Sequence, residues 1–175
     1  MTERAMSGKE YTEMAYRSLY GTLKRREADQ EHFTGKLVVR ADELIWEESA
    51  QGRNAPLVDA ELTGLDCRSF GMLLTELPPG KMSGLHKHSF EAVAYIISGE
   101  GYEVVGDRTV QWSTGDTVYL PPNIPHRHVN TSTDRPARIL QVEAWPLLQN
   151  LRSLNLVQLE TARAITDEAG APDDA

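Results

Sequence analysis

The stretch Gly80-Lys-Met-Ser-Gly-Leu-His86-Lys-His88-Ser-Phe-Glu91 is the first of two histidine blocks, and the second reads Gly115-Asp-Thr-Val-Tyr-Leu-Pro121-Pro-Asn-Ile-Pro-His126-Arg-His128-Val-Asn130. Neutral imidazole is the commonest protein ligand for first-row transition metals. Side chains alternate along a strand, so His86 and His88 point to the same face of an extended segment. We therefore expect these two histidines to bind one metal ion from one strand, with His126 reaching it from another.

The glycines and prolines around the histidines have a mechanical role. Gly80 lets the chain bend before the histidine pair, and prolines 121, 122 and 125 stiffen the approach to His126. Both blocks resemble, in order and spacing, the two conserved boxes of the cupin superfamily, where a residue at the place of Asn130 closes the second box. The resemblance covers roughly residues 65–144 and implies a single jelly-roll barrel.

The chain departs from the usual cupin pattern at the carboxylate. Cupins commonly add a glutamate ligand from the first box, but here Ala92 occupies the usual position and Glu91 comes one residue earlier. Strand alternation puts Glu91 out of phase with the histidine pair, although a turn could reset the phase. Either Glu91 reaches the metal through a slipped turn, or three histidines form the site while Glu91 lies behind them or faces away. We favour the site of three histidines.

Three neutral imidazoles would leave a divalent ion its full charge and several open coordination positions. Such a site resembles those of gentisate-type, diketone-cleaving and thiol dioxygenases, which use iron. A site with an added glutamate instead resembles those of oxalate decarboxylases, germin-like proteins and sugar isomerases, which use manganese, nickel or zinc. We therefore expect one divalent transition metal per chain, with iron(II) favoured over manganese, nickel and zinc, and a dioxygenase acting on a small oxygenated substrate, aromatic compounds included. The alternatives are a metal-dependent isomerase, lyase or decarboxylase, and a non-catalytic binder of small molecules.

Two residues near the ligands are candidates for catalysis, namely His128 and Glu91. His128 shares the face of His126 on a regular strand, so it could be a further ligand, an acid or base, or a substrate contact. The alternative is a histidine at the barrel mouth bonded to a backbone carbonyl. Gln141 and Glu143 share one face of the last predicted strand, and we assign that face to solvent rather than to the cavity.

Short segments of β-type composition recur along the middle of the chain, with turn residues between them. This pattern is typical of an antiparallel sandwich or barrel. The predicted fold class is therefore all-β, a cupin-type double-stranded β-helix or jelly-roll barrel. The predicted strands are 36–40, 44–48, 68–77, 92–97, 102–105, 109–112, 117–120, 126–130 and 137–144.

The two ends of the chain differ from this central part. Ser7 and Glu10 form a candidate capping box, and the residues that follow predict a helical N-terminal arm over 1–35. The barrel then occupies 36–148. Residues 149–175 are expected to form a C-terminal helix, within a helical segment of about 147–165, and a disordered acidic tail.

The composition limits the partners and the compartment. The net charge is −8 and no basic stripe opposes it, so we expect neither nucleic-acid nor membrane binding. Cys67 is the only cysteine, which excludes an internal disulfide bond. No signal sequence or membrane-spanning stretch is evident, and we expect a cytoplasmic protein. The resemblance to cupins implies a homodimer that binds a small-molecule substrate.

Overall fold

The computed structural model describes residues 35–165 of the protein. Contacts within the chain separate a body that begins at Lys36 from the residues before it, and only this body is described below. The predicted N-terminal helical arm and the last ten residues of the predicted tail lie outside the described residues.

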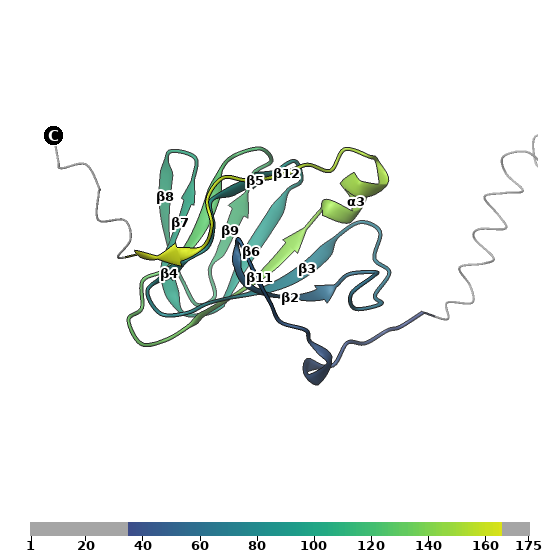
Figure 1. The fold of residues 1–175 in the computed structure, drawn as a ribbon, viewed down its shortest axis with the longest axis horizontal. Helices are drawn as coiled ribbons and strands as arrows, with labels where there is room; N and C mark the ends of the chain where they lie inside the picture. The colour runs from purple at the N-terminus through teal and green to yellow at the C-terminus, as the bar shows by residue number, and fades with distance from the viewer. Residues whose placement is uncertain (1–34, 166–175) are drawn as a thin grey trace, which may run out of the picture. The chain divides into compact units, whose positions relative to one another are not determined.

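The body is built almost entirely from short antiparallel strands, with one short α-helix near its end (Figure 1). In chain order the elements are η2 (Ala41–Glu43), β1 (Glu47–Ser49), β2 (Gly52–Val58), β3 (Gly71–Leu77), β4 (Lys81–Met82), β5 (His86–His88), β6 (Ala92–Ser98), β7 (Glu100–Val105), β8 (Arg108–Ser113), β9 (Thr117–Leu120), β10 (His126–Asn130), β11 (Ala137–Glu143), α3 (Trp145–Asn150), β12 (Leu156–Gln158) and β13 (Arg163–Ala164).

The strands form two sheets, and together they confirm the predicted jelly-roll class. One sheet has the order β1-β2-β3-β11-β6-β9, and the other has the order β12-β5-β10-β4-β13, with β7 joining β10 to β8. All described strand pairs are antiparallel. Neighbours in the sheets are often distant in sequence, as where β11 lies between β3 and β6.

The hydrophobic core lies between the sheets and follows from alternation along the strands. On β6, Ala92, Ala94 and Ile96 are buried, whereas Val93 and Tyr95 point outward. This period of two is what a strand with one covered face requires. The same core contains buried residues of β3, β8, β9 and β11, namely Leu77, Trp112, Val118, Leu120, Ala137 and Ile139.

The structure corrects the sequence prediction at the first strands. The predicted strand over 36–40 is wrong, because that segment has no strand partner. The strand predicted over 44–48 is displaced to β1, which forms a hairpin with β2, and β2 continues through Pro56. Proline lacks a donor N–H and is tolerated beside a free edge or a bulge. Both conditions hold at Pro56. The pairing of β1 with β2 extends only to Asn54, and the register between β2 and β3 shifts after Pro56.

The C-terminal segment also differs from its prediction. The helix begins at Trp145, has Pro146 in its first turn and ends at Asn150, so it covers only the start of the predicted 147–165. After it, β12 pairs with β5, and β13 pairs with β4. The open edges of those two strands explain the difference, because they offer backbone partners that the sequence pattern does not reveal.

Candidate metal centre

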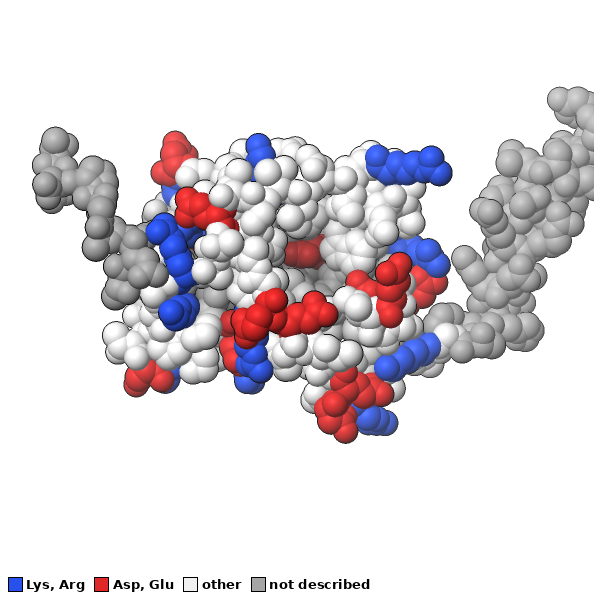
Figure 2. Space-filling view, viewed as in Figure 1, with Lys and Arg blue, Asp and Glu red and all other residues white. Residues whose placement is uncertain are grey.

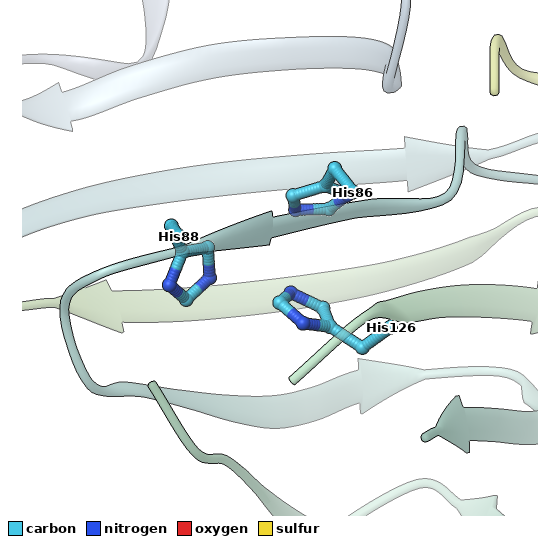
Figure 3. Close-up of side chains that lie close together, drawn as sticks. All are labelled: His86, His88 and His126. Atoms are coloured by element: carbon cyan, nitrogen blue, oxygen red, sulfur yellow. The ribbon is translucent and has the colours of Figure 1, made fainter. Parts of the chain in front are cut away.

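The structure brings the three predicted ligands together. His86 and His88 belong to β5, while His126 begins β10 and pairs directly opposite His86. Figure 3 shows their rings turned toward one another. One ring nitrogen from each residue lies within 4.8 Å of the other two, and all three residues are buried. The cluster follows from alternation on β5 and from the antiparallel register between the two strands.

Backbone carbonyls hold each ring in one orientation. The Nδ1 atoms of His86, His88 and His126 lie 2.9, 2.8 and 2.9 Å from the carbonyl oxygens of Gly84, Phe90 and Ile124. A carbonyl only accepts, so each Nδ1 must carry the hydrogen and donate it. Each Nε2 then keeps its lone pair, which is the state that binds a metal.

The Nε2 atoms also fit a metal because the protein leaves them unused. Nε2 of His88 and Nε2 of His126 are buried, and neither has a hydrogen-bond partner among the described residues. A buried polar atom without a partner is costly. A metal ion at the convergence of the three rings would give these Nε2 atoms a partner. The three histidines therefore fit the metal ion that the two histidine blocks predict.

The electrostatic environment keeps the three rings neutral. Burial, with a smaller contribution from neighbouring imidazoles, lowers the pKa of His86 to about 4 and that of His126 to about 3. Burial likewise lowers the pKa of His88. Neutral imidazole is the form that coordinates, so the rings need no proton loss near neutral pH before they bind a metal.

His128 lies beside the cluster but bonds to a different partner. Its Nδ1 is 2.6 Å from a carboxylate oxygen of Glu103, which stands directly opposite on β7. Both side chains are buried. Burial opposes a charge on the ring, but the carboxylate outweighs it and raises the pKa of His128. The partner is therefore a carboxylate rather than the backbone carbonyl that we considered, and the catalytic role of His128 stays a prediction.

Glu91 is not brought into the cluster. Its side chain is exposed, and its carboxylate accepts a hydrogen bond of 3.0 Å from the hydroxyl of Tyr119 on β9. Of the described residues, those grouped around the candidate metal position are the three histidines, without a carboxylate. The catalytic assignment of Glu91 stays a prediction, and its hydrogen bond to Tyr119 gives that assignment no support.

The assignment of Gln141 and Glu143 to solvent is wrong. Gln141 is buried and donates to the hydroxyl of Thr75, 2.7 Å away. Glu143 is half-buried and lines a cavity together with His86 and His88. Burial raises the pKa of Glu143 to about 7, against the opposing influence of His128. A carboxyl group whose pKa lies near neutrality can exchange a proton under ordinary conditions.

The cavity has a volume of about 300 Å³ and opens beside the metal cluster. Figure 2 shows the body hollowed on one face, with acidic atoms on the floor of the hollow. Its polar lining consists of the two histidines of β5 with Gln51, Asp59 and Glu143. The remaining walls are apolar and are formed by Pro56, Val58, Met72, Leu73, Phe90, Trp145, Leu154 and Leu156. A concave, mostly apolar space with a few polar groups is typical of small-molecule sites.

Two residues of this site escaped the sequence analysis. Glu103 was missed because its neighbours Tyr102 and Val104 are apolar, so the local pattern does not identify the face of Glu103 as the buried one. Trp145 was missed because nothing local predicts that it lies against Gly71, where an added Cβ would clash with its Nε1. Both contacts depend on pairing between distant segments.

Residues 73–143 match the family described as Cupin domain. The matched segment runs from β3 to β11 and contains both histidine blocks. The match, the strand order and the histidine cluster agree on a cupin-type jelly-roll fold for this part of the body.

Just over half of the chain is similar to parts of two proteins named as dioxygenases. The 1-hydroxy-2-naphthoate 1,2-dioxygenase of Nocardioides sp. (strain KP7) is 31% identical over 96 residues, or 55% of this chain and 24% of that protein. Gentisate 1,2-dioxygenase 1 of Aquipseudomonas alcaligenes is 32% identical over 105 residues, or 58% of this chain and 30% of that protein. The chain thus spans less than a third of the length of these two relatives.

Solved structures support the fold. The salicylate 1,2-dioxygenase of Pseudoaminobacter salicylatoxidans, in its adduct with gentisate, superimposes with a TM-score of 0.53 and 22% identity over 86% of this chain and 38% of that one. Within residues 35–165, no helix has the length and apolar character needed to cross a membrane.

Proposed function

We propose that this protein is a metal-dependent cupin enzyme, and specifically a non-haem iron dioxygenase that acts on a small oxygenated substrate. The observation that carries the proposal is the convergence of three neutral imidazoles without a carboxylate in their cluster, two of which, His86 and His88, line a mostly apolar cavity. The relatives named as dioxygenases support the same class, although this chain covers only part of each.

His86, His88 and His126 would hold the ion through Nε2. Iron(II) held by three neutral imidazoles would retain its charge and could accept both a substrate oxygen and dioxygen. The carbonyls of Gly84 and Phe90 keep the two rings of β5 oriented. The ring of Phe90 stacks on His88 with centroids 3.8 Å apart, which leaves that ring little freedom to turn away.

The other residues around the cavity would shape the space for the substrate and exclude water from it. The apolar walls displace water from the space next to the histidines, which strengthens electrostatic interactions there. We propose that His128 acts as a positioning residue, because its bond to Glu103 fixes the strand that also carries His126. Its removal should then change turnover more than metal content.

Oxygen consumption tests the proposal. The full chain is loaded with iron(II) and offered a panel of hydroxylated aromatic compounds and diketones in an oxygen electrode. The account expects substrate-dependent uptake, which His126→Ala abolishes and Asp107→Asn, at the exposed β7–β8 turn, preserves. Turnover that continues unchanged without oxygen would refute the oxygenase proposal.

A second candidate function is a metal-dependent isomerase, lyase or decarboxylase. Glu143 favours it, since a carboxyl group with a pKa of about 7 in the cavity could move a proton without dioxygen. The same panel, run without oxygen and with zinc, manganese or nickel, distinguishes this candidate. Tight metal retention with no turnover under either condition would favour a non-catalytic binder.

We also propose that the protein works in the cytoplasm as a homodimer. Cys67 is a free thiol in the structure, which suits a reducing compartment. Size-exclusion chromatography with light scattering tests the dimer, and a monomer at micromolar concentration would contradict it.

A further inference from the structure

One wall of the cavity comes from a segment outside the matched family residues. Residues 153–160, the C-terminal strap, follow α3 and contain β12, whereas the family match covers 73–143. β12 pairs with β5 (Figure 1), and Leu156 stands directly opposite His88. Directly opposite residues of an antiparallel pair present their side chains on the same face. The strap therefore adds its own side chains to the face of β5 that carries the metal-binding histidines.

The strap changes from polar to apolar along this face. Gln158 is opposite the other histidine of β5, and Leu156 is opposite His88. Leu154 comes two residues before Leu156 and so shares its face on an extended segment. Both leucines line the cavity, as does Phe90, which follows β5. The cavity wall therefore becomes apolar beyond His88.

Backbone contacts fix the strap beside β5. The N–H of Ser89 donates to the carbonyl of Asn155, and the hydroxyl of Ser89 donates to the carbonyl of Ser153, each at 2.9 Å. Further along, the N–H of Leu159 donates to the carbonyl of Leu85 at 2.8 Å. The two leucines between these anchors are therefore held at the cavity.

Both leucines nevertheless keep much of their surface in water, with 42% of Leu154 and 49% of Leu156 exposed. A single exposed leucine is ordinary in a folded protein. These two, however, lie on one face at the opening of a cavity next to the candidate metal centre. The cavity volume of about 300 Å³ is at the small end for ligand sites. A ligand with a long apolar part would extend beyond it and cover the leucines.

We propose that the site takes an amphipathic molecule, with an oxygen-bearing head group at the three histidines and an apolar chain across Leu154 and Leu156. The inference rests on the proposed function, because it places the head group at the proposed metal centre. The reverse orientation would leave the polar head group against the leucines without a hydrogen-bond partner. Neutral and anionic head groups both suit the site, because a divalent ion would offset a negative charge.

A series of probes with one head group isolates the apolar part of the ligand. Phenol, 4-ethylphenol, 4-butylphenol and 4-hexylphenol share a hydroxylated ring and differ only in the alkyl chain, so the contribution of the metal ion is common to all four. Their affinities for the iron(II)-loaded full chain are measured by calorimetry without oxygen. We expect the affinity to rise about threefold for each added methylene group, since each is taken out of water.

Variants assign this gain to the two leucines. Leu154→Ser and Leu156→Ser should each reduce the affinity ratio of 4-hexylphenol to phenol at least about fivefold, because they remove apolar contact area. Leu159→Ser is the matched control, since Leu159 belongs to the same strap and is 46% exposed but does not line the cavity. It should leave the ratio unchanged. An unchanged ratio in both cavity variants, or an equal reduction in Leu159→Ser, would overturn the proposal.

The outcomes also separate this inference from the proposed function. No binding of the alkylphenols, or an affinity that stops rising at 4-ethylphenol, overturns the inference even if the protein consumes oxygen with a shorter substrate. A gain with chain length that the two cavity variants reduce supports the inference even if oxygen uptake is absent, in which case only the dioxygenase proposal fails.

Discussion

Nδ1 of His128 lies 2.6 Å from a carboxylate oxygen of Glu103, and both side chains are buried next to the metal cluster. Removing one member of such a pair leaves the other buried without compensation. Glu103→Ala should therefore lower the free energy of unfolding by about 3–5 kcal/mol. Glu103→Gln retains a hydrogen-bonding group and should cost less. Denaturant unfolding of the metal-free proteins measures both, and a loss below about 1 kcal/mol in Glu103→Ala would contradict the role of the pair.

The neutral histidines predict that the metal-free protein loses stability in acid. His86 and His126 have pKa values of about 4 and about 3 when folded and near 6.5 when unfolded. Between these values the unfolded chain binds more protons, so the free energy of unfolding falls as the pH drops from about 6.5 toward 4. His126→Gln should flatten this dependence, and equal slopes in the two proteins would count against the neutral cluster.

Glu143 predicts a pH dependence of the opposite sign. Its folded pKa of about 7 lies above the ordinary glutamate pKa of 4.5, so the folded state binds more protons between these values. Stability from this group is present below about pH 4.5 and is lost as the pH rises through 7. Glu143→Gln should gain about 1–3 kcal/mol relative to the native chain between about pH 5 and pH 8. Thermal unfolding of the metal-free proteins measures the gain, with Asp107→Asn as the control that should show none.

The contact between Gly71 and Trp145 predicts an indirect effect on the ligand site. A Cβ at position 71 would clash with the indole Nε1, so Gly71→Ala must displace the ring that lines the cavity. We expect the affinity for the hydroxylated aromatic compound that supports the strongest oxygen uptake to fall about tenfold, or about 1.4 kcal/mol. Metal content should not change, because Trp145 is not part of the histidine cluster. Unchanged affinity would show that Trp145 does not shape the binding space.

Local spacing was sufficient to predict the histidine cluster. His86 and His88 alternate on one short strand, and the loop before His126 holds Asn123 at a φ of 63°, a backbone angle that asparagine tolerates better than most residues. Such features depend on neighbours in sequence, so a single chain reveals them. The strands from β6 to β11 could be predicted for the same reason.

The sequence also contained enough information to predict which side chains of β11 point inward. Arg138 faces outward and Ile139 is buried, and the same alternation carries Gln141 inward and Glu143 to the cavity wall. The assignment to solvent is wrong because alternation along the strand, rather than the polar residue type, determines which side chains of β11 point inward. Glu103 is a different case, since only the pairing of β7 with β10 places it opposite His128.

The C-terminal strands could not be predicted from local pattern. Leu156–Gln158 become a strand because β5 has an open edge at His86 and His88. The helix predicted over about 147–165 included these residues, but tertiary pairing overrides a weak local preference. The cavity wall formed by Leu154 and Leu156 was unpredictable for the same reason.

Elemental analysis of the purified protein measures whether the three histidines hold a metal ion. We predict one transition-metal ion per chain in the native protein and in His128→Gln, and almost none in His86→Ala, His88→Ala or His126→Ala. His128→Gln is the matched control, because it removes an imidazole from the same strand without touching the cluster. Full metal occupancy in His126→Ala, or loss of metal in His128→Gln alone, would contradict the three-histidine centre.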